Sequence, residues 1–509
     1  MENSRTANVK KNIFWSYVSN IGMSIISMIS RTLFVYILGA KYLGISGLFT
    51  NILGILSFTN LGIGSAIVFA LYKPIADNDT EKIKSLMQLY KIAYRIIAVV
   101  IAVLGCLLLP FLKYLVNTDI PISEIKIYYI LYLTDTVASY FVSYKTSYVT
   151  AIQKNYVITN LNTIMSIVTY VVQFTILIFV PNFLLYLINQ VGMSILLKFV
   201  TVIYLNKKYP ILTSKGAKRL DNGTKKGIWK NVRALIIHKI GDAAVNQTDN
   251  IIISIFVSTT TVGLISNYIA LSTMISTFTN TLFNSFTASI GNLVAKENRV
   301  RRKKVFDAYD FASFWVFGFV FISFVTLVQP FMILWLGENL LVDDVTVVLF
   351  FFSLYLQGMT FTTYNFKVAA GRFDEDKWIA FIQAVVNLVV SIVFIKLIGL
   401  PGVYIGTIAQ RLIVVAVRPY IVYKYVFGLK VFEYYKNFLI RLLIIGAICG
   451  VMLFLKGIII HGEVNYFNFA LMVVLTCIIP NLILFVLFGR TDEFSDLKNR
   501  FFRRQKNDC

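Results

Sequence analysis

Long apolar segments recur along the whole of this 509-residue chain, and they constrain its fold more than any other feature. A helix needs about 20 apolar residues to cross the roughly 30 Å hydrocarbon layer of a bilayer. Only 14% of the residues are charged and 57% are hydrophobic, which is far from the composition of a soluble domain. We therefore predict an all-α polytopic membrane protein with fourteen spans. The predicted spans are 13–38, 46–72, 86–111, 127–149, 157–180, 183–204, 232–257, 263–292, 308–336, 345–367, 378–398, 401–424, 437–458 and 466–489.

Lysine and arginine gather in alternate loops between these spans. The formal net charge is +23, and the densest basic runs are 207–230, 296–304 and the tail after Arg490. Cytoplasmic loops of membrane proteins carry such an excess, so we predict that both termini are cytoplasmic. The charge then reflects a membrane face and predicts no nucleic-acid partner. Because the first apolar stretch is long and Arg31 interrupts it, we expect it to remain as a span and not to be cleaved as a signal peptide.

The sequence also matches itself weakly when it is shifted by 219–220 positions. Recurring prolines and glycines mark helix kinks and close helix contacts, so their match is informative. Both halves begin on the same side, which predicts a parallel repeat of two six-helix lobes with a pseudo-two-fold axis along the membrane normal. The matched pairs are Ile21 with Ile240, Gly22 with Gly241 and Gly44 with Gly263 at 219, and Pro110 with Pro330, Tyr144 with Tyr364, Pro181 with Pro401 and Gln190 with Gln410 at 220.

This repeat predicts five parts in the chain. An N-terminal six-helix lobe spans 1–204, a basic cytoplasmic linker spans 205–231, and a second six-helix lobe spans 232–424. A further helix pair at 425–489 and a basic cytoplasmic tail at 490–509 lie outside the repeat.

Polar residues form a stripe along the first predicted span. Asn20, Ser24, Ser27 and Arg31 recur at helical spacing and share one face. Serines can be explained by hydrogen bonds between helices, and Arg31 could extend its side chain to the outer surface. Charged groups inside a span otherwise face the bundle interior, which makes Arg31 a candidate for a substrate-binding central cavity.

The seventh predicted span carries a second polar face. His238, Asp242 and Asp249 share this face at helical spacing and Asn250 widens it, although His238 could sit at an exposed cytoplasmic end. Under the repeat Arg31 corresponds to Asn250, so we expect Arg31 and Asp249 to approach each other in at least one state, since a paired charge tolerates burial. Asp242 and Asp249 are candidates for a coupling cation. A polar row in the eighth span adds Asn280 and Asn284 to the candidate cavity.

No catalytic or metal-binding motif accompanies these residues. The sequence lacks a GxxxxGK[ST] loop, HExxH and GxSxG, and its four cysteines and two histidines are scattered. We therefore expect no enzyme activity, no metal and no cofactor, and energy from an ion gradient, the membrane potential or the substrate's own gradient.

Four stretches of the sequence resemble Wzx-type polysaccharide flippases of the multidrug/oligosaccharidyl-lipid/polysaccharide (MOP) exporter superfamily. They are SRTLFVYILGAKYLGISGLFTNILGILSFTNLGIGSAI at 30–67, LYKPIADNDTEKIKSLMQLYKIAYR at 71–95, HKIGDAAVNQTDNIIISIFVSTTTVGLISNYIAL at 238–271 and ASIGNLVAKENRVRRKKVF at 288–306.

This resemblance implies fourteen helices in two lobes plus a terminal pair, in a bacterial plasma (inner) membrane. It also implies that undecaprenyl-pyrophosphate-linked oligosaccharide moves to the outer leaflet by alternating access, for capsular, O-antigen or exopolysaccharide synthesis, coupled to H⁺ or Na⁺. Polymerase and glycosyltransferase partners fit such a role. Arg31 falls where relatives carry a first-span arginine, and Asp249 falls in the TDN segment of this branch.

Three other functions are weighed against the flippase. A multidrug exporter of the same superfamily usually has twelve spans and a less cationic cavity. A lipid II flippase has the same fold and span number, so only its substrate separates it. A polysaccharide polymerase usually needs a large external loop with catalytic residues, and this chain has none. A purely structural scaffold does not account for Arg31 and Asp249 within the membrane.

Overall fold

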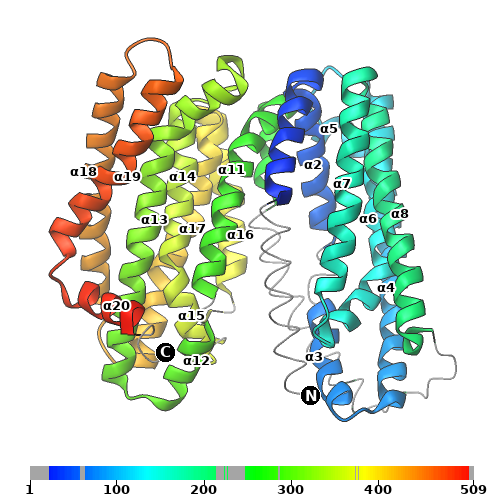
Figure 1. Cartoon of the computed structure of the whole chain (residues 1–509), viewed down its shortest axis with the longest axis horizontal. Helices are drawn as coiled ribbons and strands as arrows, with labels where there is room; N and C mark the ends of the chain where they lie inside the picture. Colours follow the sequence, from blue (N-terminus) through cyan, green and yellow to red (C-terminus); the bar gives the residue numbers. More distant parts are fainter. Residues whose placement is uncertain are drawn as a thin grey trace. The chain divides into compact units, whose positions relative to one another are not determined.

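The computed structural model is built from helices and the segments that join them (Figure 1). It describes residues 22–57, 63–213, 247–284, 287–372, 374–376 and 378–503, together with the isolated positions 220, 223 and 226. Within these residues, ten helices are long and apolar enough to cross a membrane. Three shorter apolar helices, Gly22–Leu38, Ala40–Leu56 and Ile67–Ala76, accompany them. The prediction of an all-α protein with many spans is thereby confirmed.

The chain divides into two compact units, Met1–Ser266 and Asn267–Cys509, and the division falls inside helix α11. In the first unit, α6 packs against α3, α4 and α8, α7 packs against α8, and α10 packs against α2. Its helices are Gly22–Leu38, α2 (Ala40–Leu56), α3 (Ile63–Ala76), α4 (Thr80–Leu108), α5 (Leu112–Leu115), α6 (Ile122–Ala151), α7 (Tyr156–Phe179), α8 (Phe183–Lys208), α10 (Asp249–Phe256) and the first part of α11 (Thr259–Asn284).

The second unit is organised around α13, which contacts α14, α18, α19 and α20. A tight α16–α17 hairpin packs on α14, and α12 packs on α15. Beyond the rest of α11, the helices of this unit are α12 (Thr287–Lys296), α13 (Arg299–Leu336), α14 (Asp344–Met359), α15 (Phe361–Ala369), α16 (Ile379–Ile398), α17 (Pro401–Val422), α18 (Phe432–Ile459), α19 (Tyr466–Phe488) and α20 (Asp492–Arg503).

Two predicted boundaries differ from the structure. The loop expected at 39–45 is a single residue, because Gly39 has a φ of 87° that lets the chain turn directly from the helix Gly22–Leu38 into α2. The continuous span expected at 345–367 is two helices, α14 and α15, with a break at Thr360. Hydrophobicity places a span along the sequence but does not report such local turns.

Two local structures recur at matched positions of the sequence repeat. Asp79 caps the N-terminus of α4 by accepting a hydrogen bond from the Lys82 amide, and Asn298, which corresponds to Asp79 under the repeat, caps α13 through the Arg301 amide. The turn after α6 places Gln153 at a φ of 60°, and the turn after α15 places Gly371, two positions before its match, at a φ of 67°. The two units therefore share helix starts and turns at corresponding places in the chain.

Helices α2 and α11 cross with their backbones in contact. A Cβ atom added to Gly44 would lie 1.8 Å from the carbonyl oxygen of Thr259, and one added to Gly263 would lie 1.9 Å from that of Ala40. Because the shift that relates the two glycines also relates Ala40 to Thr259, the contact is reciprocal. Only glycine permits this approach at both positions.

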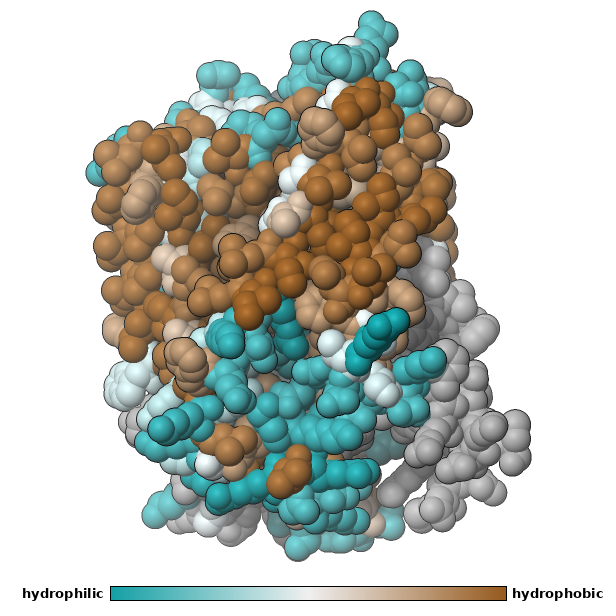
Figure 2. Space-filling model, turned by 90° about the vertical axis from the view of Figure 1, so that its left-hand side faces the viewer, coloured by the Kyte–Doolittle hydropathy of each residue, from teal (hydrophilic) through white to brown (hydrophobic). Residues whose placement is uncertain are grey.

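The outer faces of α18 and α19 are apolar, as lipid contact requires. Figure 2 shows this side of the molecule with a broad apolar surface above a polar base. Leu443 and Phe454 on α18 are 73% and 69% exposed, and Phe467 and Val486 on α19 are 77% and 73% exposed. A soluble monomer rarely exposes a continuous apolar area of this kind.

A buried ion pair joins α18 to α13. Arg441 Nη1 lies 2.6 Å from Asp310 Oδ2, and the two side chains are only 9% and 6% exposed. The Arg441 guanidinium also lies over the rings of Phe311 and Phe314, at 5.6 and 5.3 Å from their centroids. Nearby, Trp315 donates to Asn481 on α19. Charge pairing, cation–π contact and a hydrogen bond thus fix the last helix pair to the second unit.

Removing one partner of this ion pair should destabilise the protein strongly. We expect Arg441→Met to lower the free energy of unfolding by about 3–5 kcal/mol, because the Asp310 charge stays buried without its partner. The double variant Asp310→Leu/Arg441→Met should recover most of that loss. Lys303→Met, which opens the Lys303–Asp307 pair nearer the start of α13, should cost less than about 1 kcal/mol. Thermal unfolding in detergent measures all three, and a double variant no better than Arg441→Met would contradict the prediction.

The glycine crossing predicts opposite effects of one substitution at two sites. Gly263→Ala forces α2 and α11 apart, so it should lower stability by about 1–3 kcal/mol. Gly192→Ala in α8, where an added Cβ meets nothing within 4 Å, should raise stability by up to about 1 kcal/mol through helix propensity. The unfolding midpoints of the two purified variants test this, and shifts of the same sign would refute it.

Candidate functional site

Arg31 is half-buried in the first unit, where it contacts α11. Its Nη2 donates to the Ser266 hydroxyl at 2.5 Å, and this hydroxyl in turn donates to the Gly263 carbonyl at 2.7 Å. One turn further along the helix, Phe34 packs edge-on against Tyr186 of α8, with 5.0 Å between ring centroids. The guanidinium is therefore held beside the glycine crossing, and its planar array of N–H donors has the chemistry that suits an anion.

The rest of the predicted first-span stripe is only partly described. Ser24 is half-buried and Ser27 is exposed on the helix Gly22–Leu38. Asn20 lies outside the described residues. Arg31 is half-buried on the same helix, so Ser24, Ser27 and Arg31 lie on one helix, and their place in a cavity stays a prediction.

On the seventh predicted span, the structure describes the carboxyl-terminal part. Asp249 is half-buried in the first turn of α10, where the helix dipole favours a carboxylate, and Asn250 is buried. Helix α10 packs against α2 and α5. His238 and Asp242 lie outside the described residues, and the approach of Arg31 to Asp249 stays a prediction.

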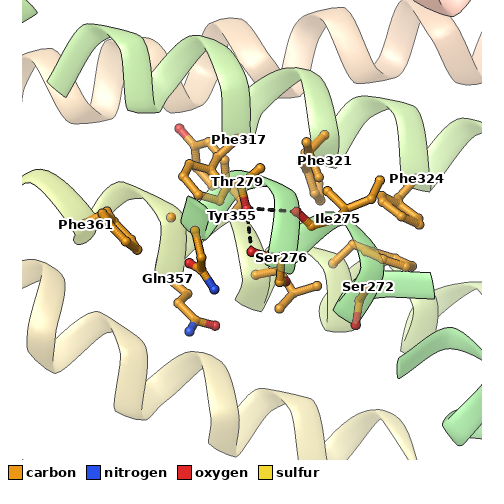
Figure 3. A pocket seen from close by; sticks show the side chains of 15 residues that line it. Ser272, Ile275, Ser276, Thr279, Phe317, Phe321, Phe324, Tyr355, Gln357 and Phe361 are labelled. Atoms are coloured by element: carbon orange, nitrogen blue, oxygen red, sulfur yellow. Dashed lines mark hydrogen bonds between the residues drawn. The ribbon is translucent and has the colours of Figure 1, made fainter. Parts of the chain in front are cut away.

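In the second unit, a small cavity opens between α11, α13 and α14. Its volume is about 50 Å³, and Asn280 is among its lining residues (Figure 3). The figure shows Gln357 and Phe361 at one end and Phe324 and Ser272 at the other. The side chain of Asn284, one turn beyond Asn280, is outside the described set.

One wall of this cavity is aromatic and the other is polar. Phe317, Phe321 and Phe324 come from α13, and Phe351 and Tyr355 come from α14. Phe317 lies against Gly358, where an added Cβ would come within 2.1 Å of its ring. The polar wall consists of Ser272, Ser276, Thr279 and Asn280 of α11, with Gln357 of α14.

Several other polar groups inside the membrane are paired within their own unit. Lys198 Nζ lies 2.5 Å from Asp135 Oδ1, so it does not extend to the surface. Lys367 forms an ion pair with Asp376, and Arg418 lies 3.7 Å from the same carboxylate. These contacts join helices, and they account for these charges without a ligand.

Sequence patterns indicated neither the aromatic wall of the cavity nor the Asp310–Arg441 pair. Phenylalanines in an apolar span carry no signal that separates a cavity wall from a lipid face. Asp310 and Arg441 are 131 residues apart, so no spacing rule relates them.

Comparisons with known proteins agree with this architecture. Residues 9–288, more than half of the chain, match the family model described as "Polysaccharide biosynthesis protein". No curated protein matches the sequence.

Among solved structures, the chain is similar to the lipid II flippase MurJ in an inward closed conformation, with a TM-score of 0.65, 14% identity, and coverage of 94% of this chain and 99% of that one. It is also similar to an inward-facing multidrug resistance MATE family transporter of the MOP superfamily, with a TM-score of 0.60, 14% identity, and coverage of 77% and 92%. A MATE transporter from Vibrio cholerae, VcmN, matches at 0.54, with 16% identity and coverage of 82% and 98%. The matching family model and the MATE- and MurJ-like fold together show that this multi-pass membrane protein belongs to the polysaccharide biosynthesis protein family.

Proposed function

We propose that the protein is a flippase that moves undecaprenyl-pyrophosphate-linked oligosaccharide repeat units from the cytoplasmic to the outer leaflet by alternating access. In this proposal it has fourteen spans in two duplicated lobes, 1–204 and 232–424, joined by the linker 205–231. The pair at 425–489 and the tail at 490–509 follow, and both termini are cytoplasmic. It works without a catalytic residue, metal or cofactor.

The observation that carries the proposal is the extent of the likeness to MurJ within a polysaccharide biosynthesis family. The match to MurJ covers 94% of this chain, whereas the matches to the two MATE transporters cover 77% and 82%. This difference in coverage is large enough to include the α18–α19 pair, which MATE-type exporters usually lack. It favours a flippase of lipid-linked glycan over a multidrug exporter.

A lipid II flippase is the second candidate, because the solved structure with the larger coverage carries that activity in its name. The family match favours the polysaccharide substrate instead. Both substrates carry a diphosphate, which an arginine binds through paired N–H donors.

We assign Arg31 to the diphosphate and the polar groups Asn20, Ser24, Ser27, His238, Asn250, Asn280 and Asn284 to the substrate path. Asp242 and Asp249 would hold the coupling cation, H⁺ or Na⁺. The support is the half-burial of Arg31 and of Asp249, and the hydrogen bond of Arg31 to Ser266.

Arg31→Ala should abolish most transport while leaving the protein folded. We expect at least a roughly tenfold drop in surface polysaccharide, with undecaprenyl-linked oligosaccharide accumulating on the cytoplasmic leaflet, and Arg31→Lys should recover only part because lysine lacks the paired donors. The measurement is polymer production and lipid-linked intermediate in the host carrying each variant at matched expression.

Lys126→Ala is the matched control, since it removes one exposed positive charge from the same unit at the start of α6. It should leave polymer production unchanged. Normal polymer with Arg31→Ala at matched expression would refute the role of Arg31, and polymer lost with no accumulated intermediate would favour a polymerase.

A further inference from the structure

We propose that the cavity lined by Ser276, Asn280 and Gln357 in the second unit is a specificity subsite that accepts one acetamido substituent of a substrate sugar. The inference rests on the proposed transport of a lipid-linked glycan and goes beyond it, because it names a feature of the sugar that the protein selects.

The size of the cavity selects a substituent and excludes a whole sugar ring. Pockets that enclose entire small-molecule ligands measure about 300–1,000 Å³, whereas this cavity measures about 50 Å³. At about 10–15 Å³ for each water-sized group, it holds roughly four such groups. An acetamido group has four non-hydrogen atoms, and a sugar hydroxyl would leave most of the space empty.

The polar wall offers hydrogen-bonding groups that none of the described residues engages. Ser272 donates to the Ile269 carbonyl, and Thr279 donates to the carbonyls of Ile275 and Ser276 (Figure 3), so both hydroxyl protons are occupied by their own helix. The side chains of Ser276, Asn280 and Gln357, by contrast, make no hydrogen bond to any described residue. An amide ligand needs one acceptor for its N–H and one donor for its carbonyl, which a serine and two carboxamides supply.

The exposed positions of the two carboxamides indicate that the cavity opens onto a water-filled space. Both side chains are exposed: Asn280 is the last residue of the candidate span Thr259–Asn280, and Gln357 lies near the middle of the candidate span Asp344–Ala369. A primary amide facing hydrocarbon at that depth would lose its hydrogen bonds to water at a cost of several kcal/mol. Polar side chains within spans face the protein interior or water, so this mouth belongs to the substrate path.

The aromatic wall completes the match to an acetamido group. Phe321, Phe351 and Tyr355 are buried and line the cavity together with Asn280 and Gln357. Phe317 is fixed by Gly358 on one side and stacks with Phe283, 5.5 Å away, on another. The ring carbons of such a wall suit a methyl group, and its polar atom is the Tyr355 hydroxyl.

Saturation-transfer NMR on the full chain in lipid nanodiscs tests the proposal with two probes. These are methyl 2-acetamido-2-deoxy-β-glucoside and methyl β-glucoside. We expect the strongest saturation on the acetyl methyl protons of the first probe and about tenfold weaker binding of the second, because the amide-recognising groups stay unpaired. Equal binding of both probes, or saturation confined to ring protons, would overturn the subsite.

Variants test whether the residues that line the cavity, and not others on the same helix, bind the acetamido group. Ser276→Leu fills the cavity and should remove the acetyl signal, and Asn280→Ala, at an exposed position, should weaken it several-fold without a change in the unfolding midpoint. Thr273→Leu is the matched control, since Thr273 is exposed on the same helix and does not line the cavity. An acetyl signal that survives both Ser276→Leu and Asn280→Ala would refute the proposal.

Transport assays keep this inference distinct from the proposed function. If vesicles containing the protein move undecaprenyl-linked glycans with and without acetamido groups equally well, the subsite fails and the flippase stands. If acetamido-selective binding is present but no lipid-linked glycan moves, the flippase fails and the subsite stands.

Discussion

Hydrocarbon offers no hydrogen-bond partners, and this constraint governs every level of the structure. Backbone groups are satisfied inside helices, and polar side chains within spans must find partners on neighbouring helices. Gln383 on α16 donates to Gln410 on α17 at 2.9 Å, and Lys198 pairs with Asp135 between α8 and α6. Asp310 and Arg441 do the same between α13 and α18. Polar groups that hold helices together in this way already have hydrogen-bond or ion-pair partners within the protein.

Polar side chains that can bind a ligand, and not only join helices, are therefore informative about function. Arg31 donates to Ser266, and its guanidinium carries the paired donors that phosphate oxygens prefer. Ser276, Asn280 and Gln357 make no hydrogen bond to described neighbours. The first unit thus offers a cation suited to phosphate, and the second offers neutral amides and rings suited to a sugar substituent. A lipid-linked glycan carries both chemistries.

The crossing of α2 and α11 involves two glycines that the predicted repeat matches. Gly44 and Gly263 match in the sequence shift, and in the structure they lie against the carbonyls of Thr259 and Ala40, which match each other as well. Ser266, which accepts from Arg31, donates to the carbonyl of Gly263. The cation is therefore positioned by a backbone contact that tolerates no side chain on either helix.

The sequence by itself determined the class of fold and the approximate place of each described span, because length and hydrophobicity are enough to identify a transmembrane helix. It also indicated Arg31, Asp249 and Asn280, since polar residues at helical spacing stand out against an apolar background. Only the tertiary structure decided what each polar group touches. Asp310 pairs with a residue 131 positions away, and the aromatic wall beside Asn280 comes from helices α13 and α14, which follow it in the chain. Partners of this kind depend on which helix faces which, and the periodicity of one helix does not identify the helix that it faces.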